Sequence, residues 1–291
     1  MKMNSWRTNP KLHHVSDSTT IQYWANFDKS SKPIHNVLVF NYGLVCNVRH
    51  FEYQIDYFDK LGYKILLHDY RGHYESKTKD GVESITFSNI VQDLNSLITE
   101  LNIEMTTHIG HSMGVNITLE YANYYPDEVK NMVLISGTVF PPQDVMFDSN
   151  IVDIAEPYIK ELQKNWGTQI EFIWKNAYMN PLASALVWNG GFNIKKTKLE
   201  FVEYYMKKLG QLSPEIFFQL LDQMRDQKVI KDLHRIKTHA LVIGGDKDKV
   251  IPNYLQQVLH QGLNNSELYI IKNGSHVPQV DFHEYINERI Q

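Results

Sequence analysis

The chain has 291 residues, of which 43% are hydrophobic and 21% charged, so it holds enough apolar material for one large domain or two ordinary ones. Its 29 basic and 33 acidic residues give a net charge of −4, which excludes a strongly cationic chain built to coat nucleic acid. One cysteine excludes an intrachain disulfide and a multi-cysteine zinc site. No apolar run is long enough to span a bilayer, and the first twenty residues hold no secretory signal, so we expect a soluble cytoplasmic protein.

Short runs of β-branched and aliphatic residues alternate with longer segments of helical period. These runs predict strands at 36–40, 63–67, 105–110 and 132–136, and again at 240–244 and 267–272. Apolar residues at three- and four-residue spacing predict helices over 51–61 and 90–101. Most strand runs are continuously apolar, as in strands that are covered on both faces. The pattern therefore predicts an α/β fold with a mostly parallel, doubly wound sheet.

The alternation of strands and helices stops after about Thr138 and resumes at Thr238. The stretch between them shows helical patterns only, and it is too long to be a simple crossover connection. We therefore expect a core formed by residues 1–139 and 238–291, with residues 140–237 inserted as a helical cap over the carboxyl edge of the sheet.

The strongest motif is G-H-S-M-G at 110–114, which lies between a predicted strand and a helix that begins near Val115. A serine on a sharp strand-to-helix turn projects its oxygen above the sheet, and the helix N-terminus supplies oriented N–H groups. The residues two before and two after the serine pack against neighbouring backbone and must be small. The motif and its context indicate that Ser112 is a nucleophile.

A serine nucleophile needs a base and an acid that orients the base. His276 lies in N-G-S-H-V-P at 273–278, directly after the last predicted strand. The loop G-G-D-K-D at 244–248, also at a strand end, offers Asp246 and Asp248 as acids. Because the carboxyl ends of parallel strands share one edge of the sheet, these loops are expected to converge on Ser112.

On these motifs the chain resembles the α/β-hydrolase superfamily, particularly its capped serine esterase and lipase-like members, from about residue 21 to the C-terminus without the cap. D-Y-R-G-H-Y-E-S at 69–76 looks like the family's architectural D-x-R-G-x-G-x-S loop, with Tyr74 in place of the second glycine. G-D-K-D at 245–248 is similar to the family's G-x-x-D, and the histidine loop matches with Ser275 replacing a glycine. The resemblance implies the α/β-hydrolase fold and a triad of Ser112, Asp248 and His276.

The resemblance also implies an oxyanion hole made by two backbone N–H groups. One belongs to Met113, and the other to Leu44 in N-Y-G-L at 41–44, where the family usually shows H-G-x. Tyr42 replaces the usual histidine, and both Tyr42 and His111 are candidate substrate-binding residues. The implied reaction is two-step acyl transfer to water, with no metal and no cofactor. A serine nucleophile argues against the dehalogenases and epoxide hydrolases of the superfamily, which use aspartate.

The cap is expected to decide the substrate. Its aromatic residues serve either helix packing or an apolar tunnel for an acyl chain; they are Trp166, Phe172, Trp174, Tyr178, Trp188, Phe192, Tyr204, Tyr205, Phe217 and Phe218. Five lysines form either a solvated helix face or a dock for an anionic acyl-carrier protein or coenzyme A; they are Lys195, Lys196, Lys198, Lys207 and Lys208. The general resemblance to pimeloyl-carrier-protein methyl ester esterases of biotin synthesis makes a carrier-linked acyl methyl ester a candidate substrate.

Two other classes of function use the same residues. A carbon–carbon bond hydrolase or an acyltransferase would employ the triad with a different bond or acceptor. A non-catalytic ligand-binding protein on this scaffold would retain the triad without turnover.

Overall fold

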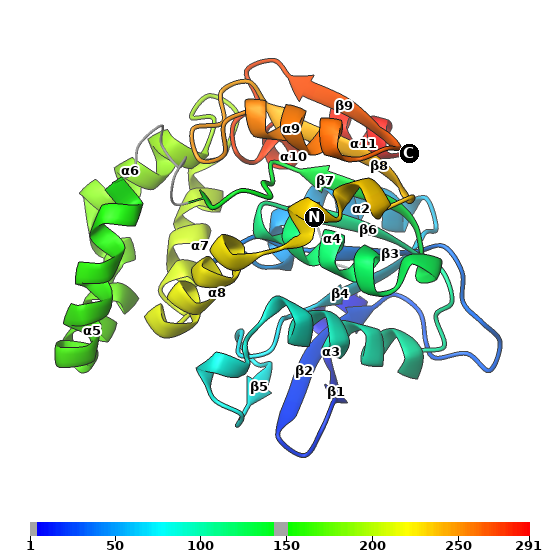
Figure 1. Cartoon of the computed structure of the whole chain (residues 1–291), viewed down its shortest axis with the longest axis horizontal. Coiled ribbons are helices and arrows are strands. Elements are labelled where there is room, and N and C mark those ends of the chain that lie inside the picture. Colours follow the sequence, from blue (N-terminus) through cyan, green and yellow to red (C-terminus); the bar gives the residue numbers. More distant parts are fainter. Residues whose placement is uncertain (1–4, 143–150) are drawn as a thin grey trace.

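The computed structural model describes residues 5–142 and 151–291. Nine strands of this part form one sheet (Figure 1). In spatial order they are β1 (Lys11–His14), β2 (Thr19–Ala25), β4 (Lys64–His68), β3 (Val37–Asn41), β6 (Thr106–His111), β7 (Val129–Ile135), β8 (His239–Gly245) and β9 (Ser266–Ile271), with β5 (Lys77–Thr78) beside β2. All neighbours from β4 to β9 are parallel, whereas β1, β2 and β5 pair antiparallel. The predicted mostly parallel α/β sheet is confirmed.

The six strands expected from the sequence are present, but the hairpin of β1 and β2 was missed. In β2 the buried residues Thr19, Ile21, Tyr23 and Ala25 alternate with half-buried ones. This alternation is typical of an antiparallel strand near the sheet edge with one face covered. The continuously apolar runs that mark the central strands do not occur in this segment.

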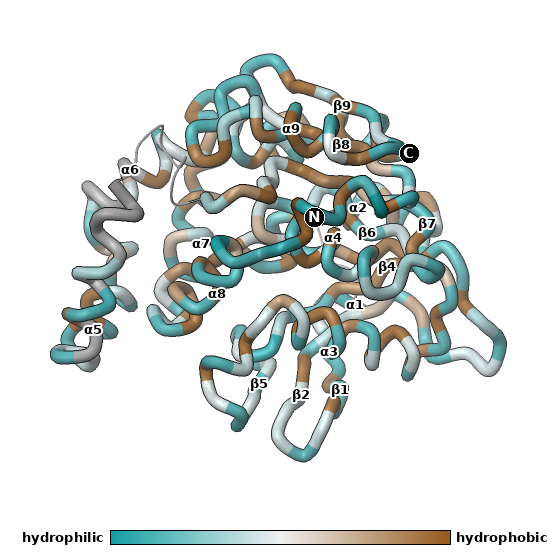
Figure 2. Tube along the Cα trace, in the orientation of Figure 1, coloured by the Kyte–Doolittle hydropathy of each residue, from teal (hydrophilic) through white to brown (hydrophobic). Residues whose placement is uncertain are grey.

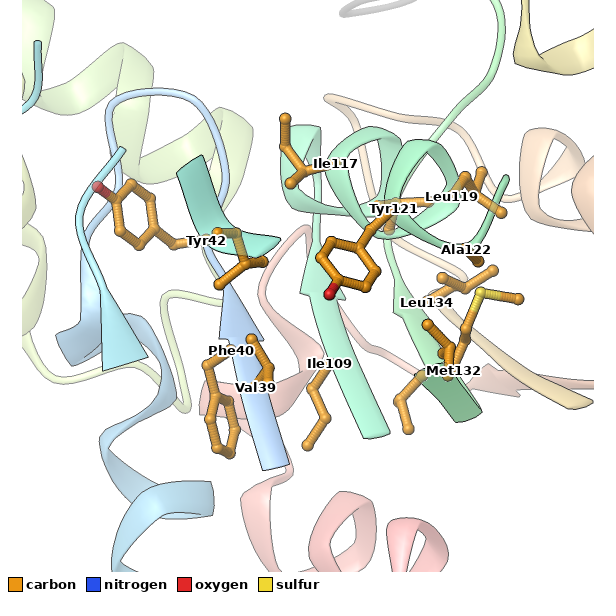
Figure 3. Packing of buried hydrophobic residues seen from close by; sticks show 14 of the residues in the cluster. Val39, Phe40, Tyr42, Ile109, Ile117, Leu119, Tyr121, Ala122, Met132 and Leu134 are labelled. Carbon is orange, nitrogen blue, oxygen red and sulfur yellow. The ribbon is translucent and has the colours of Figure 1, made fainter. Parts of the chain in front are cut away.

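Helices cover both faces of the sheet. On one face α3 (Phe87–Glu100) packs against α4 (Met113–Tyr124), and on the other α2 (Glu52–Lys60) packs against α11 (His283–Ile290). Figure 3 shows Leu119, Tyr121 and Ala122 of α4 lying beside β6 and β7, and all three are buried. Figure 2 shows apolar residues concentrated along the central strands. The short helix α1 (Ser5–Thr8) and helices α9 (Tyr254–Gly262) and α10 (Pro278–Asp281) complete the core.

Between β7 and β8 the described residues form helices and no strand. These helices are α5 (Ile151–Lys175), which is broken at Trp166, then α6 (Pro181–Gly191), α7 (Leu199–Leu209) and α8 (Pro214–Asp226). Figure 1 shows them, green to yellow, on one side of the sheet; we call residues 151–226 the α5–α8 segment. Residues 143–150 of the predicted cap lie outside the described residues. No described helix is both long enough and apolar enough to cross a membrane.

Candidate active site

Ser112 lies on the turn that joins β6 to α4, in a strained backbone conformation. Its φ of 54° and ψ of −122° fall in a region that residues with a side chain rarely adopt. The Ser112 N–H donates a 2.9 Å hydrogen bond to the carbonyl of Ile135, and the Ser112 carbonyl accepts one of 2.9 Å from the Val115 N–H. The turn is therefore held on both sides, which fixes the position of the serine at the carboxyl end of β6.

The two glycines of the motif are needed because backbone passes close to them. A Cβ on Gly114 would lie 1.9 Å from the carbonyl oxygen of Asn41 on β3. A Cβ on Gly110 would lie 2.5 Å from the carbonyl oxygen of Gly114 itself. Both contacts are far below any real Cβ distance and both involve backbone, which cannot move aside. The expectation that these positions must be small therefore has a structural reason.

His276 and Asp248 meet at the ends of β9 and β8. The Nδ1 atom of His276 lies 2.9 Å from Oδ2 of Asp248. Since a carboxylate only accepts, the proton belongs on Nδ1, and Nε2 is left as an acceptor. The other oxygen of Asp248 accepts hydrogen bonds of 2.9 and 2.8 Å from the N–H groups of Val250 and Ile251. These two donors, which the sequence analysis missed, satisfy a carboxylate whose side chain is fully buried.

Asp246, the other acid in this loop, has a different partner. Its Oδ1 accepts a hydrogen bond of 2.6 Å from the Asn273 N–H in an exposed turn. Asp246 thus joins the acid loop to the histidine loop, while Asp248 is the acid that contacts His276.

The predicted oxyanion donors belong to two residues near Ser112. Met113 follows the serine directly at the start of α4, and Leu44 lines the same cavity as Ser112. A Cβ on Gly43 would lie only 2.8 Å from Cβ of Ser112, so the loop after β3 passes the serine at very short range. Within the described residues, neither the Leu44 N–H nor the Met113 N–H donates a hydrogen bond to the protein. Both donors are therefore free to bind an oxyanion.

Tyr42 does not line the cavity, so the structure does not support its predicted contact with substrate. Its side chain is fully buried beneath the loop after β3. The Tyr42 hydroxyl donates a 3.1 Å hydrogen bond to Oδ1 of Asp69 and accepts one of 3.2 Å from the Tyr70 N–H. The Tyr70 hydroxyl in turn donates to the Tyr42 carbonyl at 2.8 Å. Tyr42 thus joins the oxyanion loop to the 69–76 loop, which agrees with the architectural role expected of that loop.

His111 lines the cavity but also has a partner behind it. Its Nε2–H donates a 2.8 Å hydrogen bond to the carbonyl oxygen of His276. Burial lowers the pKa of His111 well below its ordinary value, so the ring is neutral. His111 therefore holds the backbone of His276 and presents an uncharged wall to the cavity.

Ser112 and His276 line one cavity of about 300 Å³, whose other walls are mainly apolar. Among the aromatic residues considered from the sequence, Phe192, Tyr205 and Phe217 line it, whereas Trp166 and Phe172 are more than half exposed. The remaining lining residues are Leu44, Val45, Cys46, His111, Pro142, Val187, Gly191, Leu209, Leu221, Met224, Val250, Ile251 and Val277. Burial raises the pKa of the Cys46 thiol, so this cysteine contributes as a small apolar group.

The five lysines considered as a docking surface fall into two groups. Lys195, Lys196 and Lys198 are exposed just before α7, and Lys207 and Lys208 lie in its last turn. The Lys208 ammonium lies 4.7 Å from the centre of the Tyr74 ring. Eight helical residues, 199–206, separate the two groups, so only the first is a compact exposed patch. Among the described residues, no group of three or more His, Cys, Asp or Glu side chains is arranged to hold a metal ion.

Two curated proteins are similar in sequence to this chain over most of its length. The chain is 25% identical over 242 residues to non-heme chloroperoxidase CPO-A1 of Kitasatospora aureofaciens, covering 82% of this chain and 84% of the relative. It is 24% identical over 242 residues to the bifunctional esterase/perhydrolase DCH of Acinetobacter calcoaceticus, covering 82% and 81%.

Solved structures show the same fold. A bromoperoxidase from Bacillus anthracis superposes with a TM-score of 0.73 at 20% identity, covering 97% of this chain and 98% of that one. An esterase from Exiguobacterium antarcticum gives 0.71 at 19%, covering 96% and 97%. The sequence model of the family described as "alpha/beta hydrolase fold" matches residues 36–282. The chain therefore belongs to the alpha/beta hydrolase fold family.

Proposed function

We propose that this protein is a serine hydrolase that cleaves carboxylic esters with an apolar acyl group. One observation carries the proposal. Ser112, on its strained turn, shares an apolar cavity with His276, and Nδ1 of His276 is hydrogen-bonded to Asp248. The three residues proposed as nucleophile, base and acid therefore lie around one cavity, which supports this assignment.

In the proposed mechanism, Nε2 of His276 takes the proton of Ser112 as the serine oxygen attacks the ester carbonyl. The N–H groups of Leu44 and Met113 stabilise the negative oxygen that forms. His276 then gives the proton to the leaving alcohol and later activates the water that releases the acid. Asp248 keeps the imidazole oriented and stabilises its charged form at each step.

The volume and the apolar lining of the cavity favour a small apolar acyl group as its occupant. Its volume of about 300 Å³ lies at the lower end of the range of roughly 300 to 1,000 Å³ that is usual for ligand pockets. Phe192, Tyr205 and Phe217 come from the α5–α8 segment and form part of its wall. In this proposal residues 140–237 act as a lid whose side chains select the acyl group.

A carrier-linked acyl methyl ester, as in biotin synthesis, is the specific substrate proposed within this class. Its docking surface would be the exposed group of Lys195, Lys196 and Lys198, which could attract an anionic carrier. The test compares hydrolysis of a methyl-esterified acyl-carrier protein with that of the free methyl ester. Reversing the three charges should lower kcat/KM for the carrier substrate alone; equal losses for both substrates would contradict the docking surface.

The decisive experiment for the enzyme class is labelling with a fluorophosphonate probe followed by peptide mapping. We expect one labelled serine, Ser112, and no label in Ser112→Ala. A folded wild-type protein that is not labelled would instead support a non-catalytic ligand-binding protein.

A second candidate concerns the acceptor of the acyl group. Two relatives, at 24% and 25% identity, are named as an esterase/perhydrolase and a chloroperoxidase. The same acyl-enzyme could pass its acyl group to hydrogen peroxide, which would give a peracid and free Ser112. Product analysis with water alone, with hydrogen peroxide, and with an added alcohol would separate hydrolysis, perhydrolysis and acyl transfer. A carbon–carbon bond hydrolase would accept a β-diketone substrate in the same assay.

A further inference from the structure

A buried carboxylate that is not part of the triad lies beside the loop of His276. Asp281, in the short helix α10, has only 7% of its surface exposed. Its Oδ2 accepts a 3.0 Å hydrogen bond from the Ser275 N–H and one of 2.6 Å from the Ser275 hydroxyl. A buried carboxylate with these charge-assisted bonds holds its partners more firmly than a neutral acceptor would.

These bonds act on both neighbours of His276 in the chain. Ser275 precedes the histidine, and the same Ser275 hydroxyl that donates to Asp281 accepts a 3.2 Å hydrogen bond from the Val277 N–H. The residues before and after His276 are therefore tied to a single carboxylate. Together with the Asp248 contact at Nδ1 and the His111 contact at the carbonyl, this network determines where Nε2 of His276 points.

The second oxygen of Asp281 reaches the α5–α8 segment. The hydroxyl of Thr197, which is buried in the loop before α7, donates a 2.6 Å hydrogen bond to Oδ1 of Asp281. Apolar contacts run parallel to this bond. Buried side chains from both sides form one cluster, in which Phe192, Phe201 and Val202 pack with Val277 and Val280.

We propose that Asp281 is a positioning residue that fixes His276 and couples its alignment to the placement of the α5–α8 segment. The inference rests on the proposed function, because it takes His276 as the general base. A movement of the loop at Thr197 would change the position of His276 through the Asp281 carboxylate, without any direct contact between this loop and the reacting atoms.

The test is Asp281→Asn, which keeps the shape of the side chain but replaces one acceptor oxygen with a donor. With p-nitrophenyl acetate below the melting temperature, we expect kcat to fall about 10- to 100-fold while KM changes little, because displacement of a catalytic group by about 1 Å costs that much. The rate of fluorophosphonate labelling of Ser112 should fall in parallel.

The matched control is Asp93→Asn. Asp93 is also a buried carboxylate, at 2% exposed, but it pairs with Arg71 away from the cavity. We expect this variant to be less stable and to keep wild-type kcat. If Asp93→Asn lowers kcat as much as Asp281→Asn does, the effect is one of general stability and the positioning role is wrong.

Thr197→Val tests the link to the α5–α8 segment. It should lower kcat about threefold in the wild-type and in Asp93→Asn, but have no further effect in Asp281→Asn, since residues in one network are not additive. Full additivity with Asp281→Asn would overturn the coupling. If Asp281→Asn does not fold, Ser275→Ala, which keeps the carboxylate, gives the same readout.

The outcomes also separate this inference from the proposed function. Wild-type labelling of Ser112 with unchanged kcat in both Asp281→Asn and Ser275→Ala would refute the inference alone. Absence of labelling in the folded wild-type protein would refute the proposed function and, with it, the inference.

Discussion

Replacing Asp69 by Asn should stabilise the protein, and by more at higher pH. Asp69 is almost completely buried, and burial raises the pKa of its carboxyl to about 7, although the Tyr42 hydrogen bond and the charge of Lys208 oppose the shift. An asparagine has nearly the same shape and can still accept the hydrogen bond from Tyr42 through its Oδ1. The substitution therefore removes the ionisation while leaving this contact in place.

The size and sign of the effect follow from the difference between the two states. The ordinary pKa of the carboxyl is 3.8, and the folded value is about 7. Below the lower value the folded and unfolded chains are both protonated, and Asp69 costs nothing. As the pH rises from the unfolded pKa to the folded pKa, stability is progressively lost, by about 1.4 kcal/mol for each pH unit, and above the folded pKa the loss levels off. The penalty is roughly 2 kcal/mol near pH 5 and roughly 4 kcal/mol near pH 8, as an upper limit.

Urea denaturation of the wild-type protein and Asp69→Asn, at about pH 5 and about pH 8, measures this difference. The free energy of unfolding of the variant relative to wild type should rise by about 2 to 3 kcal/mol between the two pH values. Because the comparison is between two proteins at the same pH, the titration of all other groups cancels. A relative stability that is the same at both pH values would refute the reasoning.

The remaining predictions concern the reaction itself. Ser112→Ala should abolish ester hydrolysis, measured with p-nitrophenyl acetate, and leave the circular dichroism spectrum unchanged. Asp248→Asn should lower kcat by a factor of about 10³ to 10⁴, whereas Asp246→Asn should stay within a few-fold of wild type; the reverse order would show that the acid is misassigned. Gly43→Ala places a Cβ 2.8 Å from that of Ser112, so kcat should fall about 100-fold, and an unchanged kcat would show that the oxyanion loop can shift without loss.

The central part of the fold could be predicted because its strands are covered on both faces. Burial on both faces makes residues 37–40 and 132–135 continuous apolar runs, and no helix pattern competes with them. The strand Thr19–Ala25, second from the sheet edge, shows only a weak alternation, and its polar residues resemble a loop. Helix α6 could not be predicted, because neither the length of the segment between β7 and β8 nor the spacing of its apolar residues marks where this helix begins and ends.

Some residues of the candidate site could likewise be predicted from the sequence, and others could not. Ser112, Asp248 and His276 each lie within a short local motif, so the sequence places them and the sheet edge brings them to one region. Tyr42 was expected to face the substrate because it lies in the motif of the oxyanion loop. The motif gives the neighbours of Tyr42 in the chain but not the direction of its side chain. Asp281 was missed because its partner Thr197 lies 84 residues earlier in the chain, and no local pattern encodes such a contact.

The shared cluster of the α5–α8 segment and the histidine loop limits how this protein can be recombined with its relatives. A chimera that replaces residues 140–237 would lose Thr197 and the apolar partners of Val277 and Val280. Such a graft is expected to exchange substrate preference only when residues 275–281 are transplanted with it. In this protein the α5–α8 segment and the loop of His276 are packed together, so the proposed specificity element and the proposed general base have to be exchanged together.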